Sequence, residues 1–130
     1  MGRGIESGRE AGRPWDIGER TFAFALDVVR LCRLLDGRTG VGRTLGAQLL
    51  RAGTSIGANV EEAQAGQSRA DFVSKYAIAL KEAREARYWL RLVQSAQEAP
   101  EKTCAGLISE SEQLAKIIGA IIAKARGIRP

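Results

Sequence analysis

The sequence predicts an all-α protein, an antiparallel up-down-up-down four-helix bundle. Four long stretches repeat apolar residues at intervals of three and four, the period of a helix that is buried along one side. Short breaks containing Gly, Ser or Pro separate them, and no stretch alternates apolar and polar residues as a half-buried strand does. Aromatic residues make up only 5% of the chain, and a core of Leu, Ile, Val and Ala suits helix-on-helix packing. Helices joined by short loops run antiparallel to their neighbours.

The first helix is expected at residues 16–36, with Pro14 and Asp16 as start signals and Gly37 as the stop. Its apolar residues form two groups on nearly opposite sides, Phe22, Leu26 and Val29 against Phe24, Val28, Leu31 and Leu35. A helix that is apolar on two sides is either sandwiched within a core or partly covered by another subunit. Because a domain of this size rarely sandwiches a helix, covering by another subunit is favoured.

A turn at residues 37–40 precedes a second helix, expected from residue 41 or 43 to about residue 65. Gly46, Gly53 and Gly57 line one strip of this helix. Each interior Gly costs about 0.5–1 kcal/mol relative to Ala, so tertiary packing has to stabilise the helix. A glycine strip lets a neighbouring backbone approach closely, and a ligand pressed against the strip is the alternative.

The third helix is expected from Arg69 to about residue 97, with Ser68 as its N-cap and Asp71 as the partner in a capping box. The fourth helix opens at Pro100 and runs to about residue 126. All four helices fit one domain, because 130 residues can bury a single core without metal or disulfide help.

The bundle itself is expected to occupy residues 14–127. Residues 1–13 are rich in Gly, Arg and Glu and are expected to form a disordered leader, and residues 128–130 form a tail. The chain has no signal peptide and no apolar stretch long enough to span a bilayer, so we expect a cytoplasmic protein without a membrane partner.

The composition excludes several classes of function. The chain contains no histidine, which excludes two-His metal sites, Glu-x-x-His di-iron bundles and Ser-His-Asp triads. Its two cysteines, Cys32 and Cys104, cannot make a zinc site alone. Both occupy apolar helical positions, so buried reduced thiols are expected, with a disulfide as the alternative. We expect no metal, no cofactor and no small-molecule substrate.

Polar residues recur along one side of the second helix within an arc of about 80°: Gln48, Arg51, Ser55, Asn59 and Glu62. In a structural interpretation, this polar stripe faces neighbouring helices, and Arg51 pairs with Glu85 first and Glu82 second. An unpaired buried charge costs several kcal/mol, and Gln48, Ser55 and Asn59 would complete a hydrogen-bonded network. In a functional interpretation, the stripe is an exposed groove for a ligand or an RNA backbone. The structural interpretation is favoured, since polar networks beside an apolar seam commonly specify packing.

Basic residues gather on one flank of the third helix: Lys81, Arg84, Arg87 and Arg91. The three arginines fall within about 60° of one another, and guanidinium groups at this spacing can bind successive phosphates. The other interpretation, which is favoured for the flank taken by itself, is a solvated flank that forms salt bridges with Glu82, Glu85 or a neighbouring subunit. Trp89 lies on the opposite flank and is expected in the core or an interface. The formal charge of +5 favours anionic partners without choosing between nucleic acid and membrane.

The stretch from Gln48 to Leu92 resembles a known family. The pattern Q-x-x-R-A-x-x-S-x-x-x-N-x-x-E, followed by D-F and then A-x-x-x-x-x-E, is similar to four-helix-bundle proteins encoded in intervening sequences of bacterial large-subunit ribosomal RNA. The same family includes the accessory variability determinant of diversity-generating retroelements. The matching positions are Gln48, Arg51, Ala52, Ser55, Asn59, Glu62, Phe72, Ala79 and Glu85. Ala63 replaces a usual Gly, and Glu82 adds a charge where a small Ser is common.

The resemblance implies a barrel-like homopentamer, which would explain the doubly apolar first helix. It also implies structured RNA, or a reverse transcriptase with its template RNA, as partners. We therefore expect a non-enzymatic oligomeric adaptor that binds RNA through the basic flank. The alternative is a purely structural or protein-binding homo-oligomer. An enzyme that uses Arg51, Glu62, Glu82 or Glu85 is disfavoured, because no nucleophile–base arrangement is readable.

Overall fold

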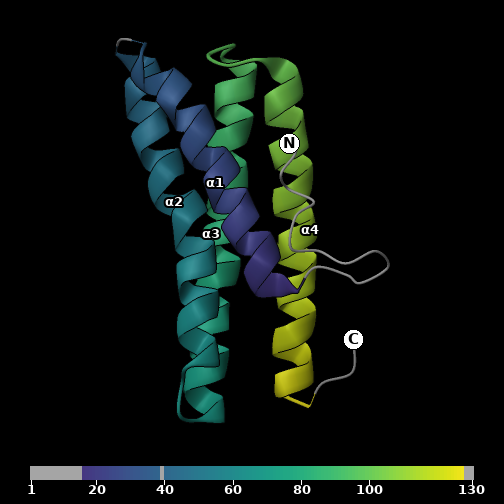
Figure 1. Cartoon of the computed structure of the whole chain (residues 1–130). Helices are drawn as coiled ribbons and strands as arrows, with labels where there is room; N and C mark the ends of the chain where they lie inside the picture. The colour runs from purple at the N-terminus through teal and green to yellow at the C-terminus, as the bar shows by residue number, and fades with distance from the viewer. Residues whose placement is uncertain (1–15, 39, 128–130) are drawn as a thin grey trace.

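The computed structural model describes residues 16–38 and 40–127, which form an antiparallel four-helix bundle (Figure 1). Its helices are α1 (Ile17–Asp36), α2 (Val41–Gln64), α3 (Arg69–Ser95) and α4 (Glu101–Ala125), and this part of the chain contains no strand. Each helix packs against the next one in the chain, and α1 also contacts α4, which closes the bundle. The predicted all-α fold is confirmed.

The helix bounds predicted from the sequence agree with the structure to within two residues. The largest difference is at the end of α3, where Ala96 is the C-cap and Gln97 adopts a left-handed φ of 58°. A left-handed residue directly after the cap closes a helix, although glycine is the usual choice there. The expected disordered leader, residues 1–13, and the expected tail, residues 128–130, lie outside the described residues.

Side-chain caps hold two of the helix starts. At α1 the cap is reciprocal: the Glu19 N–H donates to Asp16 Oδ1 at 2.7 Å, and the Asp16 N–H donates to Glu19 Oε1 at 3.1 Å. At α3 the hydrogen bond runs one way, from the Asp71 N–H to Ser68 Oγ at 3.0 Å. Ser68 is therefore the predicted N-cap, but Asp71 does not complete a capping box, because its carboxylate is one methylene shorter than that of Glu.

The core is aliphatic and lies on the bundle axis. The largest of its fully buried side chains are Tyr76, Phe24, Leu31, Leu35, Leu49, Ile56, Leu90, Leu114 and Ile118. Alanines fill the centre of α3, where Ala79, Ala83 and Ala86 are fully buried. Small residues at these positions let the neighbouring helices approach α3 closely, which is consistent with the low aromatic content of the chain.

The glycine strip of α2 is covered by α1. A Cβ built at Gly53 would lie 2.8 Å from Val28 Cγ1, and one at Gly46 would lie 3.1 Å from Leu35 Cβ. A Cβ at Gly57 would lie 3.2 Å from Thr21 Oγ1. These distances are tighter than ordinary van der Waals contact, so the strip brings α1 and α2 together, and the alternative of a ligand on this strip is wrong.

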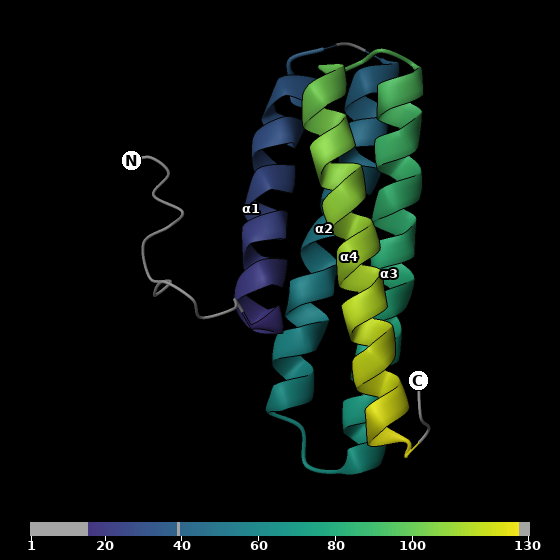
Figure 2. The same cartoon turned by 90° about the vertical axis from the view of Figure 1, so that its right-hand side faces the viewer.

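The helix α1 is the shortest of the four, with 20 residues, and it starts beside the middle of α4 (Figures 1 and 2). The end of the bundle that carries the α2–α3 connection therefore consists of three helices. The start of α1 is tied to α4 by Arg20, whose Nη2 lies 2.7 Å from Glu110 Oε1. None of the described helices is long and apolar enough to cross a membrane.

Candidate functional site

Arg51 joins α2 to α3 at the edge of the core. Its Nη1 lies 3.3 Å from Glu82 Oε1, and its Nη2 pairs with Glu85 Oε2. The same Glu85 oxygen accepts a hydrogen bond from Trp89 Nε1 at 3.3 Å. The Glu82 side chain is only 10% exposed, whereas that of Arg51 is 48% exposed. The sequence therefore identified the right partners but ranked them without knowing that Glu82 is the buried one.

The rest of the polar stripe does not extend this cluster. Ser55 Oγ donates to the Arg51 carbonyl at 2.6 Å, and Asn59 Nδ2 donates to the Ser55 carbonyl at 2.9 Å. Both bonds stay within α2, so they do not link helices, and Gln48 is exposed. Glu62 pairs instead with Lys75 at 3.0 Å, and this hydrogen bond raises the pKa of the Lys75 ammonium. The expected network is thus wrong in extent: only Arg51, Glu82 and Glu85 form it, with Trp89.

The predicted basic flank divides into paired and unpaired residues. Arg87 Nε lies 2.6 Å from Glu112 Oε2 of α4, so the expected alternative partners, Glu82 and Glu85, are wrong for this arginine. Lys81, Arg84 and Arg91 are exposed, and none of them forms an ion pair with a residue in the described part of the chain. Trp89 is half-buried on the α2-facing side with Glu85, away from the arginines.

The basic surplus of the bundle is concentrated on α3. This helix carries six Lys or Arg residues against three Asp or Glu residues, whereas α1, α2 and α4 each carry equal numbers of both. Arg126, the C-cap of α4, adds one further positive charge beside α3. An anionic partner is therefore attracted most strongly to the side of the molecule that α3 and α4 form.

A groove between α3 and α4 collects part of this charge, and sequence reasoning missed it. It encloses about 320 Å³ and is lined by Ala77, Leu80, Lys81, Arg84, Gly119, Ile122, Ala123 and Arg126. Arg126 was not among the predicted site residues. The sequence did contain a pattern that could have indicated its position: Gly119, Ala123 and Arg126 follow one another at helical spacing on a single side of α4.

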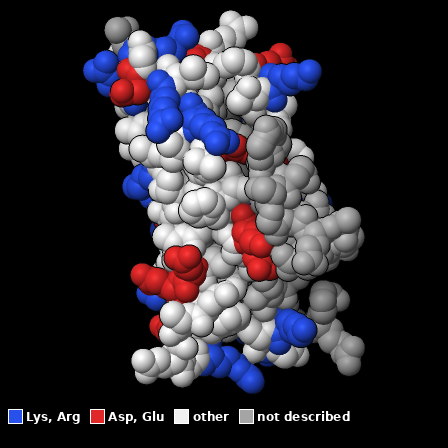
Figure 3. All heavy atoms as spheres, in the orientation of Figure 1, with Lys and Arg blue, Asp and Glu red and all other residues white. Residues whose placement is uncertain are grey.

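The two apolar groups predicted on α1 differ in burial. Phe24, Val28, Leu31 and Leu35 are buried, whereas Phe22 is 70% exposed and Leu26 is 39% exposed. Val29, the third member of the second group, is half-buried. The helix is therefore not sandwiched within its own bundle, and Phe22 and Leu26 face solvent. Figure 3 shows an uncharged area on the left of this face, with basic residues above it and acidic residues beside and below it.

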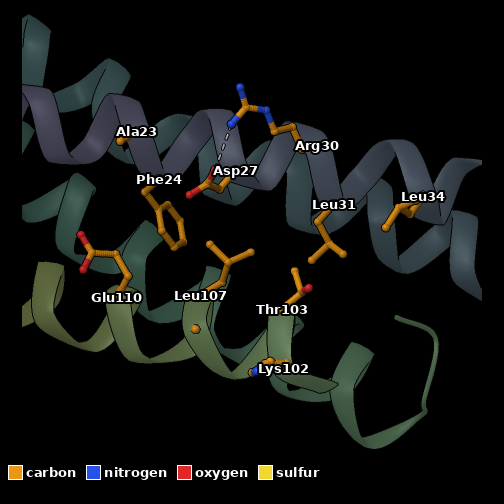
Figure 4. Close-up of a pocket in the computed structure, with 11 residues that line it drawn as sticks. Ala23, Phe24, Asp27, Arg30, Leu31, Leu34, Lys102, Thr103, Leu107 and Glu110 are labelled. Atoms are coloured by element: carbon orange, nitrogen blue, oxygen red, sulfur yellow. Dashed lines mark hydrogen bonds and ion pairs between the residues drawn. The ribbon is translucent and has the colours of Figure 1, made fainter. Parts of the chain in front are cut away.

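A second groove lies between α1 and α4, where these helices pack less closely than the other neighbours do. It encloses about 590 Å³, and Phe24, Leu31 and Leu107 point into it from the two helices (Figure 4). Charges of both signs rim the groove: Asp27 pairs with Arg30 at 3.4 Å, and Glu110 and Lys102 lie on α4. Unlike the α3–α4 groove, it has no surplus of either sign.

Both cysteines are buried, and they are free thiols, so the alternative of a disulfide is wrong. Burial raises the pKa of the Cys32 thiol to about 11, and it raises the pKa of Cys104 as well. Cys32 Sγ also donates to the Gly46 carbonyl at 3.4 Å, which fixes it against α2. Within residues 16–38 and 40–127, no cluster of three or more His, Cys, Asp or Glu side chains is arranged to hold a metal ion.

Comparisons with known proteins agree with this architecture. The family model described as 23S rRNA-intervening sequence protein matches residues 14–120. Among solved structures, the chain is similar to a protein of unknown function from the S23 ribosomal protein family of Bacteroides thetaiotaomicron, with a TM-score of 0.76 and 37% sequence identity. The match covers 82% of this chain and 98% of that one. No curated protein matches the chain.

Proposed function

The chain belongs to the family of 23S rRNA-intervening sequence proteins, and on this premise we propose that it is a non-enzymatic accessory protein that binds structured RNA. The observation that carries the proposal is the unpaired basic surface of α3. Lys81, Arg84 and Arg91 are exposed without a carboxylate partner in the described bundle. The other three helices show no such surplus of charge, so the distribution, rather than the net charge alone, supports an anionic partner.

The physical basis of the binding is release of the counterions that surround RNA phosphates. The logarithm of the binding constant falls linearly with the logarithm of the salt concentration, and each phosphate neutralised by Lys or Arg makes this fall steeper by about 0.7–0.9. Arg84 and Arg91 lie two turns apart on the same flank and can reach separate phosphates. Arg87 lies between them but already has Glu112 as a partner, so its contribution is expected to be smaller.

A salt titration tests this proposal. Binding of a fluorescein-labelled RNA hairpin is followed by anisotropy at several KCl concentrations, for the wild type and for a variant with Arg84, Arg87 and Arg91 changed to Gln. The variant should bind more weakly, with a slope that is shallower by about 2. The matched control changes Arg33, Arg38 and Arg43 to Gln, which removes the same number of charges from α1, α2 and the turn between them. Absence of salt-dependent binding by the wild type would refute the proposal, and equal effects in both variants would show that α3 is not the site.

We also propose that the protein works as a homo-oligomer, with the pentamer implied by the family resemblance as the expected state. The exposed group of Phe22 and Leu26 supports this, because a solvent-facing apolar group on one helix is typical of a subunit interface. Light scattering should give about 70 kDa for five chains of 14.0 kDa. Phe22→Ser should shift the mass towards the monomer. Ile78→Ser, an apolar residue of similar exposure to Leu26 on another face, should leave the mass unchanged.

The resemblance implies a more specific partner as well, a reverse transcriptase with its template RNA. A reverse-transcriptase gene beside the coding sequence would support that assignment, and a position within a 23S ribosomal RNA gene would support ribosomal RNA. An oligomer that ignores RNA at moderate salt would instead favour the purely structural or protein-binding alternative.

A further inference from the structure

The α3–α4 groove differs from the α1–α4 groove in its charge. Three of its eight lining residues are basic, Lys81, Arg84 and Arg126, and none is acidic. These three side chains form no ion pair with any residue that the structure describes, whereas Arg20, Arg51 and Arg87 at other helix contacts each face a carboxylate. The groove thus presents positive charge that the bundle itself does not neutralise.

The geometry of the groove leaves room for an anion between these charges. Gly119 lies on its α4 side, and a Cβ built there would meet nothing within 4 Å. Ala77 and Ala123 are the other small lining residues, while Leu80 and Ile122 supply an apolar surface. Small residues beside these three cations let an extended ligand approach the helix backbones, and the apolar surface can contact a ribose. The two helices run side by side here, so the cations come from both walls (Figure 2).

Two of the three cations repel each other weakly when no ligand is bound. Lys81 and Arg84 are three residues apart on one helix, a spacing at which like charges repel. A phosphate between them and Arg126 would relieve this repulsion, and arginine offers a planar fork of donors that fits phosphate oxygens.

We propose that the groove formed by Lys81, Arg84, Gly119 and Arg126 binds the phosphodiester backbone of an RNA strand. This inference rests on the proposed RNA-binding function and deepens it by adding Arg126 and the wall of α4 to the basic flank of α3. The strand is expected to enter the groove backbone first, since three cations line it and phosphate oxygens are the charged acceptors that Lys and Arg bind most strongly. Binding in the groove is therefore expected to depend weakly on RNA sequence.

The test measures separately how the shape of the groove and its positive charge affect RNA binding. Gly119→Leu fills the groove without changing any charge, and Gly106→Leu is the matched control, because Gly106 lines the α1–α4 groove and a Cβ there also meets nothing within 4 Å. Arg126→Gln removes one cation from the groove, and Arg33→Gln removes one exposed, unpaired cation from the described part of α1. All four variants are titrated with the same single-stranded 20-nucleotide RNA at several KCl concentrations, after circular dichroism has shown that each is folded.

We expect Gly119→Leu to raise the Kd at least fivefold and Gly106→Leu to change it less than twofold. Arg126→Gln should reduce the salt slope by about 0.7, the value for one contact to a single strand, and Arg33→Gln should not. If the wild type binds RNA while Gly119→Leu and Arg126→Gln behave like their controls, the groove assignment is wrong and the proposed function stands. If the wild type binds the hairpin but not the single strand, the groove assignment is wrong and the proposed function is retained, whereas if it binds neither RNA, both proposals are wrong.

Discussion

The close contact between α1 and α2 makes a quantitative prediction about Gly53. Replacing Gly53 by Ala adds one methyl group at a fully buried position, where the new Cβ would lie 2.8 Å from Val28 Cγ1 and 2.9 Å from Val28 Cγ2. Val28 is itself fully buried and β-branched, and a β-branched side chain in a helix has one strongly preferred χ1. Rotation of Val28 therefore cannot relieve the contact, and the two helices must move apart.

Two opposing terms set the magnitude. An alanine in place of a helical glycine favours folding by about 1 kcal/mol. Overpacking of a well-packed core typically costs about 1–3 kcal/mol, and contact with both methyl groups of Val28 places this site in the upper part of that range. We expect a net loss of about 1–2 kcal/mol in the free energy of unfolding. For a domain of this size, that loss lowers the Tm by about 4–8 °C.

Gly106→Ala is the control, because the same substitution there meets no atom within 4 Å. It should raise the free energy of unfolding by about 0.5–1 kcal/mol. Both variants are measured by urea and thermal unfolding at one protein concentration, since an oligomer has a concentration-dependent Tm. The double variant Val28→Ala, Gly53→Ala should be more stable than the sum of the single effects by about 1 kcal/mol or more. The reasoning fails if Gly53→Ala is as stable as Gly106→Ala, or if the two sites act additively.

Three other predictions concern stability. Arg51→Leu leaves the carboxylate of Glu82 buried without its partner, so it should lower the free energy of unfolding in urea by about 1–2 kcal/mol. Adding Glu82→Gln should recover part of this loss. Arg43→Leu, which removes an exposed ion pair, is the control and should cost less. Because burial raises the pKa of the Cys32 thiol from 9.0 to about 11, its contribution is complete below pH 9 and is lost between pH 9 and 11. The free energy of unfolding should therefore fall by at most about 2–3 kcal/mol between these pH values, and Cys32→Ala should not show this fall. Gln97 has a left-handed φ of 58°, which glycine adopts without strain. Gln97→Gly should therefore raise the free energy of unfolding by about 1 kcal/mol, which thermal unfolding would show as a higher Tm.

Much of the fold could be predicted because it depends on local rules. The period of the apolar residues gave the four helices, and the capping residues Asp16 and Ser68 gave two of their starts. The glycine strip indicated a close helix contact, and the structure shows that α1 makes it. These features are encoded within about one or two turns of helix, so they need no knowledge of the neighbouring chain segments.

The features that could not be predicted depend on how far one helix is shifted along another. A helical wheel gives the direction of a side chain but not the residue opposite it. The partners considered for the basic flank were therefore carboxylates of α3 or of a neighbouring subunit, whereas Arg87 lies against Glu112 of α4. The expected burial of the polar stripe failed for a related reason. A long side chain such as that of Arg51 keeps its charged end partly in water while it contacts a buried partner, so a stripe beside the core need not be inside it. Arg126 joined the basic groove only through the packing of α4 on α3.

The two flanks of α3 therefore differ in what a substitution on them should change. The flank that faces α2 carries Glu82, Glu85 and Trp89, all engaged with Arg51 or with one another, so substitutions there should alter stability first. The flank that faces α4 carries Lys81 and Arg84, whose charges are not engaged by the described bundle, so substitutions there should alter the salt dependence of binding first. Glu85, which matches the family pattern, belongs to the first flank, while the cations proposed to bind RNA lie outside the matched positions. If this division holds, relatives that keep the Arg51 cluster can vary their basic flank, and with it their anionic partner, without losing the bundle.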